Sequence, residues 1–127
     1  MMTQQAYYEA YRHTADVAGV STETRLLLNY LAREGRSSKR AIEIGLGWYD
    51  RKIRKHVELA RRAGIPIMSS SGALPGYWLS TDIAEIEGFI HHEIDSRMAS
   101  LEDQRRRLMG TVAALDAHPA RQQAMSL

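Results

Sequence analysis

The stretch that decides the fold runs from residue 38 to residue 79 and reads SKRAIEIGLGWYDRKIRKHVELARRAGIPIMSSSGALPGYWL. Its first part places Ile42 and Leu46 at helical spacing and then reaches Gly47, where the lack of a Cβ lets the backbone turn sharply. We therefore expect a short helix that ends in a tight corner, with a second helix starting just beyond Trp48.

The second helix is predicted from the period of its apolar residues. Ile53, Val57 and Ala60 recur at intervals that place them on one helical face, and the opposite face is largely basic. Gly64 is suited to end the helix in a left-handed conformation.

A β-hairpin is predicted after this helix. Residues 65–68 and 76–79 alternate as short strands, and residues 69–75 between them are rich in Ser, Gly and Pro, which is typical of a turn. The alternation directs four side chains inward: Ile65, Ile67, Tyr77 and Leu79.

With these elements in place, residues 42–79 resemble the winged helix-turn-helix superfamily. The frame from Gly64-Ile65-Pro66-Ile67 to Gly76-Tyr77-Trp78-Leu79 is similar to its biotin-repressor-type subgroup. A preceding helix, predicted from the N-cap Ser21, extends the resemblance to residues 21–79. The resemblance implies an α+β, mainly helical fold with a two-stranded wing and a DNA-binding role, although winged helices also serve as protein-docking modules.

Positive charge is concentrated on this stretch. Between Arg36 and Arg62 there are nine Lys or Arg against three acids, an excess of six, whereas the whole chain carries +2, so the remainder carries −4. The electrostatic field of such a basic stretch attracts a polyanion, and the affinity for that polyanion falls as the salt concentration rises. A solvated basic face is the alternative, but its coincidence with the predicted turn and wing favours nucleic acid.

The second helix supplies the predicted base contacts. In the fold that the sequence resembles this helix enters the major groove, so Arg51, Lys52 and Lys55 are expected at base edges or groove walls. Arg51 is the strongest candidate because a guanidinium can fork onto guanine O6 and N7. Arg54 and Arg62 are expected at phosphates.

The starts of the two helices supply further candidates. Ser37 or Ser38 is the predicted N-cap, and Lys39 and Arg40 then lie at the positive end of a helix dipole, where a phosphate would be a favourable partner of Ser38, Lys39 and Arg40. Ordinary surface charge is the alternative for these three residues. Tyr49 could bond a phosphate or simply cover the corner. The predicted hairpin tip, residues 69–75, has no basic residue, so sequence specificity is expected to rest on the helix.

A long C-terminal helix is predicted to run to Asp116. From Ile94 onward, apolar residues recur in a heptad pattern typical of a coiled-coil seam, interrupted by one charged core position, Arg105. The predicted dimerisation residues are Ile94, Met98, Leu101, Arg105, Leu108, Val112 and Leu115. A homodimer is the favoured interpretation, because a single small domain would expose this strip. The alternative is that the helix folds back on Tyr7, Tyr8 and Tyr11.

The expected organisation is an N-terminal extension (1–20), the winged domain (21–80), the long helix (81–117) and a tail (118–127). In the extension, the tyrosines could stack on bases or, in the favoured interpretation, pack on the domain or a partner subunit. Ile83, Ile86 and Ile90 are expected to pack on the winged domain.

Other chemistry is not indicated. The chain has no cysteine, no apolar run long enough for a membrane span and no signal-peptide pattern, so we expect a cytoplasmic, nucleoid-associated protein. His91 and Asp95 are one helical turn apart, but two ligands do not close a metal site, and a solvated polar face is the better interpretation. No cofactor motif or catalytic constellation is present, which predicts that the protein is not an enzyme.

The sequence therefore predicts a dimeric, sequence-specific double-stranded DNA-binding transcriptional regulator of prokaryotic or phage type, acting by occupying its site. The alternative is a winged-helix protein-interaction or replication-accessory module with weak or nonspecific DNA binding and a protein partner.

Overall fold

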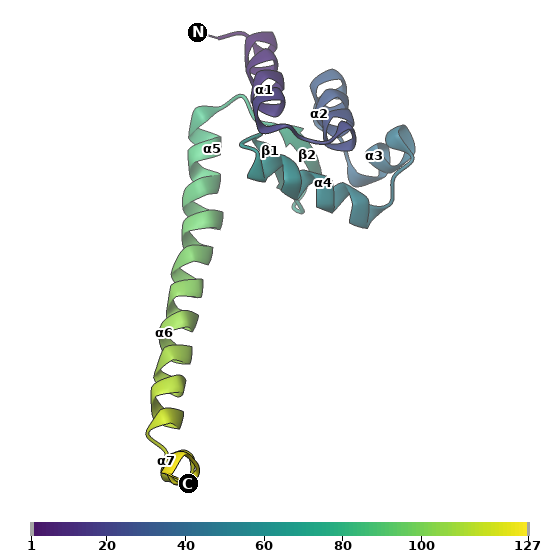
Figure 1. Cartoon of the computed structure of the whole chain (residues 1–127). Helices are drawn as coiled ribbons and strands as arrows, with labels where there is room; N and C mark the ends of the chain where they lie inside the picture. Colours follow the sequence, from purple (N-terminus) through teal and green to yellow (C-terminus); the bar gives the residue numbers. More distant parts are fainter. Residues whose placement is uncertain (1, 127) are drawn as a thin grey trace. The chain divides into compact units, whose positions relative to one another are not determined.

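The computed structural model describes residues 2–126 and divides into two compact units, residues 1–86 and 87–127 (Figure 1). The chain is mainly helical with one small two-stranded antiparallel sheet, which confirms the predicted α+β class at that level. In the first unit the elements in order are α1 (Gln4–Ala18), α2 (Thr22–Glu34), α3 (Lys39–Leu46), α4 (Asp50–Arg62), β1 (Ile67–Ser70) and β2 (Gly76–Leu79).

Side-chain caps define the starts of two helices. Ser21 Oγ accepts from the Thr24 amide at 3.2 Å, and Ser38 Oγ accepts from the Ala41 amide at 3.0 Å, so α2 and α3 both begin where the sequence predicts. After α4, Gly64 adopts a positive φ of 91°, as expected for a residue that turns the chain out of a helix.

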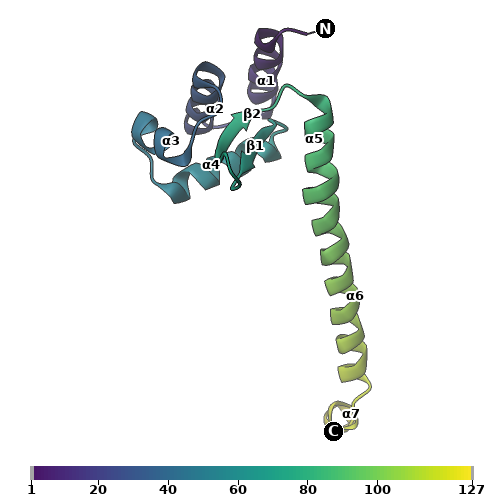
Figure 2. The ribbon, with the colours of Figure 1, turned by 180° about the vertical axis from the view of Figure 1, so that it is seen from behind.

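The core of the first unit is built from all four helices and the hairpin, which Figure 2 shows from behind. Leu27, Leu31 and Ile42 are fully buried, and Ile53 and Ile67 join them from α4 and β1. Burying side chains of this size stabilises the fold by about 1.5–3 kcal/mol each.

The N-terminal helix contributes to this core. Tyr8, Tyr11 and Ala15 are buried in the same cluster, and the Tyr11 hydroxyl donates to the Ser80 carbonyl. Burial raises the pKa of the Tyr11 phenol. Packing on the domain is therefore the correct interpretation for these two tyrosines, and their rings are not exposed for base stacking.

The hairpin lies where the sequence predicts it, but its first strand covers residues 67–70 in place of the predicted 65–68, and it has an additional attachment. Ile67 faces Leu79 and Met68 faces Trp78. The segment before α3 joins the sheet through Ser37, whose amide donates to the Tyr77 carbonyl at 2.9 Å while the Tyr77 amide donates to the Ser37 carbonyl at 2.8 Å. This pair of bonds fixes the start of α3 beside the hairpin.

The chain beyond β2 is helical. Helix α5 (Ile83–Phe89) begins after Asp82, whose carboxylate accepts from the Ala84 amide at 3.0 Å. The prediction that Ile83 packs on the first unit is wrong, because its side chain is 60% exposed. Ile83 directly follows the capping residue Asp82, and in this first turn of α5 its side chain faces solvent.

The second unit contains a π-helical segment, η1 (Ile90–Asp95), followed by α6 (Ser96–Asp116). Helix α6 ends at the predicted residue. A short helix, α7 (Pro119–Ser126), occupies the part of the chain predicted as a tail. Proline begins it, a position where the missing N–H has no intrahelical partner to lose. Within residues 2–126, none of the helices is both long and apolar enough to span a membrane.

Gly45 packs against Tyr30, and this contact yields a stability prediction. An added Cβ at Gly45 would lie 2.5 Å from Tyr30 Cε2, so Gly45→Ala should force α3 away from α2 and lower the free energy of unfolding by about 1–3 kcal/mol. Chemical denaturation measures this. Gly72→Ala is the control, because its Cβ would meet only Ser70 Oγ at 3.6 Å. Equal stability of the two variants would contradict the close packing.

Candidate nucleic-acid interface

The corner between α3 and α4 is shaped by one glycine and one buried indole. Gly47 has a φ of 68°, a left-handed conformation that L side chains rarely adopt, and Trp48 behind it is buried. Tyr49 occupies the N-cap position of α4 but makes no side-chain cap, and it is 65% exposed. The corner therefore presents an exposed phenol at the start of α4.

Helix α4 packs on α2 through its predicted apolar face. Ile53, Val57 and Ala60 are buried, which leaves the basic residues of the helix toward solvent or along its flanks. The amphipathic period thus decides which cations α4 can offer to a ligand.

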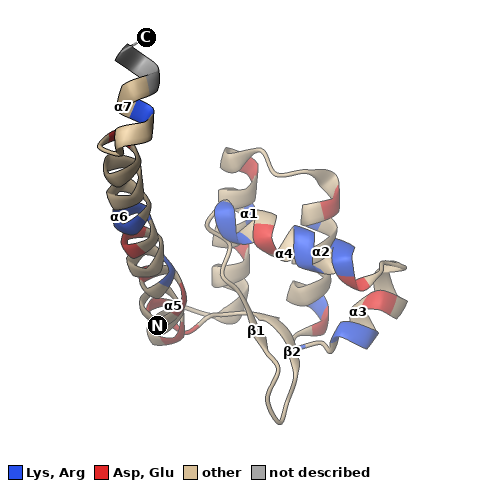
Figure 3. Cartoon of the chain, turned by 90° about the horizontal axis from the view of Figure 1, so that it is seen from below, with Lys and Arg blue, Asp and Glu red and all other residues tan. Residues whose placement is uncertain are grey.

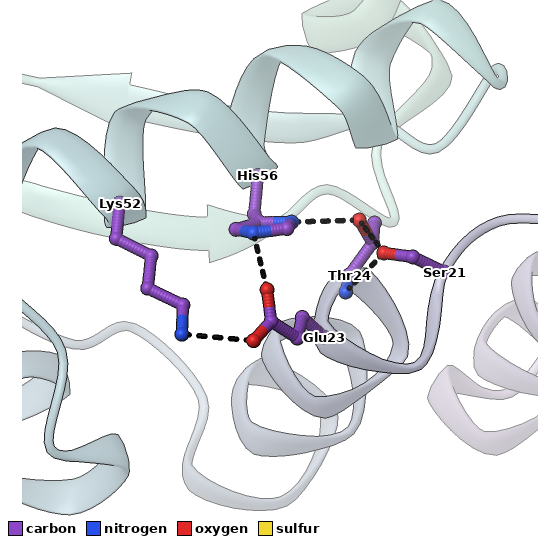
Figure 4. A network of polar contacts seen from close by, with 5 residues as sticks. All are labelled: Ser21, Glu23, Thr24, Lys52 and His56. Atoms are coloured by element: carbon purple, nitrogen blue, oxygen red, sulfur yellow. Dashed lines mark hydrogen bonds and ion pairs between the residues drawn. The ribbon is translucent and has the colours of Figure 1, made fainter.

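His56 links the two helices through a buried polar network (Figure 4). Its Nδ1 lies 2.9 Å from Thr24 Oγ1, and its Nε2 lies 3.1 Å from Glu23 Oε2. The tautomer that satisfies both contacts carries its proton on Nε2, which donates to Glu23, while Nδ1 accepts from the Thr24 hydroxyl. Burial lowers the pKa of His56, and the charge of Glu23 opposes that shift only in part. These contacts and its burial make His56 a structural residue that joins α4 to α2.

Lys52 is turned toward the same network. Its ammonium lies 2.9 Å from Glu23 Oε1 and 4.9 Å from the centre of the Trp48 ring. The hydrogen bond from Lys52 lowers the pKa of Glu23. Lys52 therefore contacts Glu23 of α2 and the Trp48 ring, so its ammonium already has a partner within the chain.

Arg51 and Lys55 are exposed on α4 and, within residues 2–126, have no carboxylate partner. The spacing of four residues places them on one side of the helix, a turn apart. These two cations have full hydrogen-bonding capacity for an external ligand.

The remaining predicted cations are paired with acids of the same chain. Asp50 lies 2.6 Å from Arg54 and 3.7 Å from Lys39, which ties α4 to the start of α3. Arg40 lies 3.9 Å from Glu43, and Arg62 lies 3.4 Å from Glu58. Such exposed pairs contribute little stability, but each must be screened or exchanged before the cation can serve a phosphate.

Most of the predicted DNA-contact residues line one of two surface hollows. One, of about 600 Å³, is lined by Tyr49, Arg51, Lys52 and Lys55 together with Glu23 and His56. The other, of about 570 Å³, lies between the start of α3 and the hairpin and is lined by Ser38, Lys39, Arg40, Ser69, Ser70, Ser71, Pro75, Gly76 and Tyr77. Arg54 and Arg62 line neither hollow.

Figure 3 shows how charge is distributed on these elements. Basic residues lie on α3 and α4, and the tip of the hairpin carries neither sign of charge. Two arginines contact the strands of the hairpin. Arg61 Nε donates to the Ile67 carbonyl at 2.8 Å, and the Arg36 guanidinium lies 4.0 Å from the centre of the Trp78 ring. The tip offers hydroxyl groups, backbone groups and the exposed side chain of Leu74 to a ligand.

Sequence reasoning missed the acids that organise this surface. Glu23 is far from Lys52 and His56 in the chain, and no local pattern signals their contact. The Asp50–Arg54 pair, at a spacing of four, could have been found, but the additional contact of Asp50 with Lys39 could not.

His91 and Asp95 lie 3.5 Å apart in η1, and among the described residues no three acidic or histidine side chains gather as a metal-binding group.

Comparisons with protein-family models, curated proteins and solved structures found no match for this chain.

The buried His56 predicts a pH dependence of stability. The unfolded chain takes up a proton on this histidine near pH 6.5, whereas the folded protein resists it, so the unfolded state binds more protons and the free energy of unfolding falls as pH falls below about 6.5. His56→Gln should lose this part of the pH dependence in denaturation curves. The exposed His13→Gln should retain it, and identical pH profiles for His56→Gln and the wild type would exclude the buried network as its origin.

Proposed function

We propose that this chain is a winged helix-turn-helix protein that binds double-stranded DNA at specific sites and regulates transcription as a homodimer. The observation that carries the proposal is the free pair Arg51 and Lys55 on the outward face of α4. Its neighbours Lys39, Arg40, Lys52, Arg54 and Arg62 are each within 4.0 Å of a carboxylate.

In the proposed complex α4 enters the major groove. A guanidinium at the first turn of the entering helix is suited to guanine O6 and N7, which assigns base reading to Arg51 and a groove-wall or base contact to Lys55. Tyr49, beside them, is suited to donate its hydroxyl to a phosphate.

Contacts to the DNA backbone are assigned to the second hollow. Ser38, Lys39 and Arg40 at the start of α3 and the hydroxyls of residues 69–71 line it together, and groups of this chemistry position a protein on phosphates without reading sequence. Arg54 and Arg62, on α4, are assigned to further phosphates. Regulation would then be steric, through occupancy of the site.

The second unit supports the homodimer. Apolar side chains at Ile94, Met98, Leu101, Leu108, Val112 and Leu115 are between 43% and 65% exposed. A heptad-spaced stripe of this kind is buried in proteins by a second helix. In this account the second helix comes from another copy of the chain.

A second candidate is a protein-interaction or replication-accessory module of the same fold, with weak DNA binding. The internal pairing of five predicted cations favours it, because paired charges weaken the field that attracts a polyanion. The exposed stripe of α6 would then dock a protein partner.

Arg51 separates the two candidates. Arg51→Ala should weaken binding to the preferred duplex by about 1–3 kcal/mol, which is roughly 5- to 150-fold in Kd, and should weaken binding to mixed-sequence duplex much less. Fluorescence anisotropy at fixed salt measures both. Arg106→Ala removes the same charge from the outer side of α6 and should change neither. An equal loss on all sequences would leave only nonspecific phosphate binding.

The stripe on α6 predicts the behaviour of charged variants. Leu101→Asp together with Leu108→Asp places carboxylates in the proposed seam and should give monomers in sedimentation analysis. Ala99→Asp together with Ala113→Asp adds the same charge on the opposite side of the helix and should leave the dimer intact. Dimers that persist in the first variant would rule out the seam.

A further inference from the structure

We propose that two copies of α6 pair as a parallel, in-register coiled coil in which Arg97 of each chain meets Glu102 of the other. This inference rests on the dimer proposed above and is independent of DNA binding. It adds the direction and register of the pair.

The heptad positions follow from the stripe itself. Met98, Arg105 and Val112 occupy the first core position of successive heptads, and Leu101, Leu108 and Leu115 occupy the second. A valine at the first position with leucine at the second favours a two-stranded coil. The residues that flank this core form two edges of different chemistry.

One edge is largely acidic and the other is not. The edge that follows the leucine positions carries Glu102, Met109 and Asp116, with Asp95 one heptad earlier. The edge that precedes the first core positions carries Arg97, Gln104 and Thr111. In an antiparallel pair each edge faces its own kind, so carboxylates would meet carboxylates. In a parallel pair the acidic edge faces the edge that carries Arg97.

The ion pairs within α6 leave Arg97 available for this contact. Arg105 lies 3.7 Å from Glu102, Arg107 lies 2.8 Å from Asp103, and Arg106 also contacts Asp103. Arg97, by contrast, has no ion pair or hydrogen bond through its side chain to any residue in 2–126. A parallel pair brings it opposite Glu102 of the second copy, five residues further along.

The charged core position fits the same arrangement. In register, the two Arg105 side chains lie in one layer, and each keeps Glu102 of its own chain as a partner. A charged residue in one core layer lowers the stability of a coiled coil but disfavours other alignments.

Disulfide trapping tests the direction directly, because the chain has no cysteine of its own. Leu101→Cys, equilibrated in glutathione redox buffer without DNA, should give on the order of tenfold more covalent dimer than Ser96→Cys, which places its thiol on the outer side of the helix. Mixtures of Leu101→Cys with Arg105→Cys or Val112→Cys should give mainly like-with-like disulfides. Mixed disulfides in the majority would establish an antiparallel pair and overturn the proposal.

Charge exchange tests the proposed ion pair. Arg97→Glu should raise the dimer Kd by about tenfold in the wild-type background but much less in a Glu102→Gln background, where the partner carboxylate is absent. An equal effect of Arg97→Glu in the two backgrounds would overturn the pairing of Arg97 with Glu102. If Leu101→Cys and Ser96→Cys give equal trapping, the dimer itself fails, whereas binding of DNA by α4 is measured separately and keeps its own test.

Discussion

The seating of α4 on α2 is the constraint on which the rest of the candidate interface depends. Apolar burial holds one face of α4 in the core through Ile53 and Val57, and His56 adds a directional contact to Thr24 and Glu23. Rotating α4 would expose buried side chains and leave a buried imidazole without partners. The free energy lost in this way exceeds what new contacts at the exposed surface could supply. The helix therefore has one orientation, and that orientation decides which cations face outward.

The acids of the first unit divide its cations into free and paired groups. Asp50 and Glu23 hold three cations close to the protein surface, and Arg51 remains free beside Lys55. This division implies an interface whose specific contacts come from few residues, while the paired cations add a weaker, salt-sensitive attraction. In the proposed homodimer a second copy would add affinity, because two weak interfaces on one duplex reinforce each other.

Local features of the fold were readable from the sequence, and long-range polar contacts were not. Ser21 and Ser38 each cap a helix by accepting from an amide three residues ahead, so short-range chemistry predicts these caps. Strand alternation predicts a hairpin after α4, but the start of β1 at Ile67 depends on the pairing with β2. The contact of Glu23 with Lys52 joins segments far apart in the chain. The same limit explains Tyr11, whose partner at Ser80 is supplied by the folded hairpin, and Ile83, whose apolar character alone predicted burial.

The central claim, site-specific recognition of DNA by α4, is tested most directly by selection from a random-sequence duplex pool. The wild-type protein would be incubated with the pool at near-physiological salt, and the retained duplexes would be sequenced over several rounds. The account predicts enrichment of one short motif, repeated as two half-sites because a dimer binds. Salt-sensitive retention without any enriched motif would contradict it and would favour a module whose specific partner is a protein.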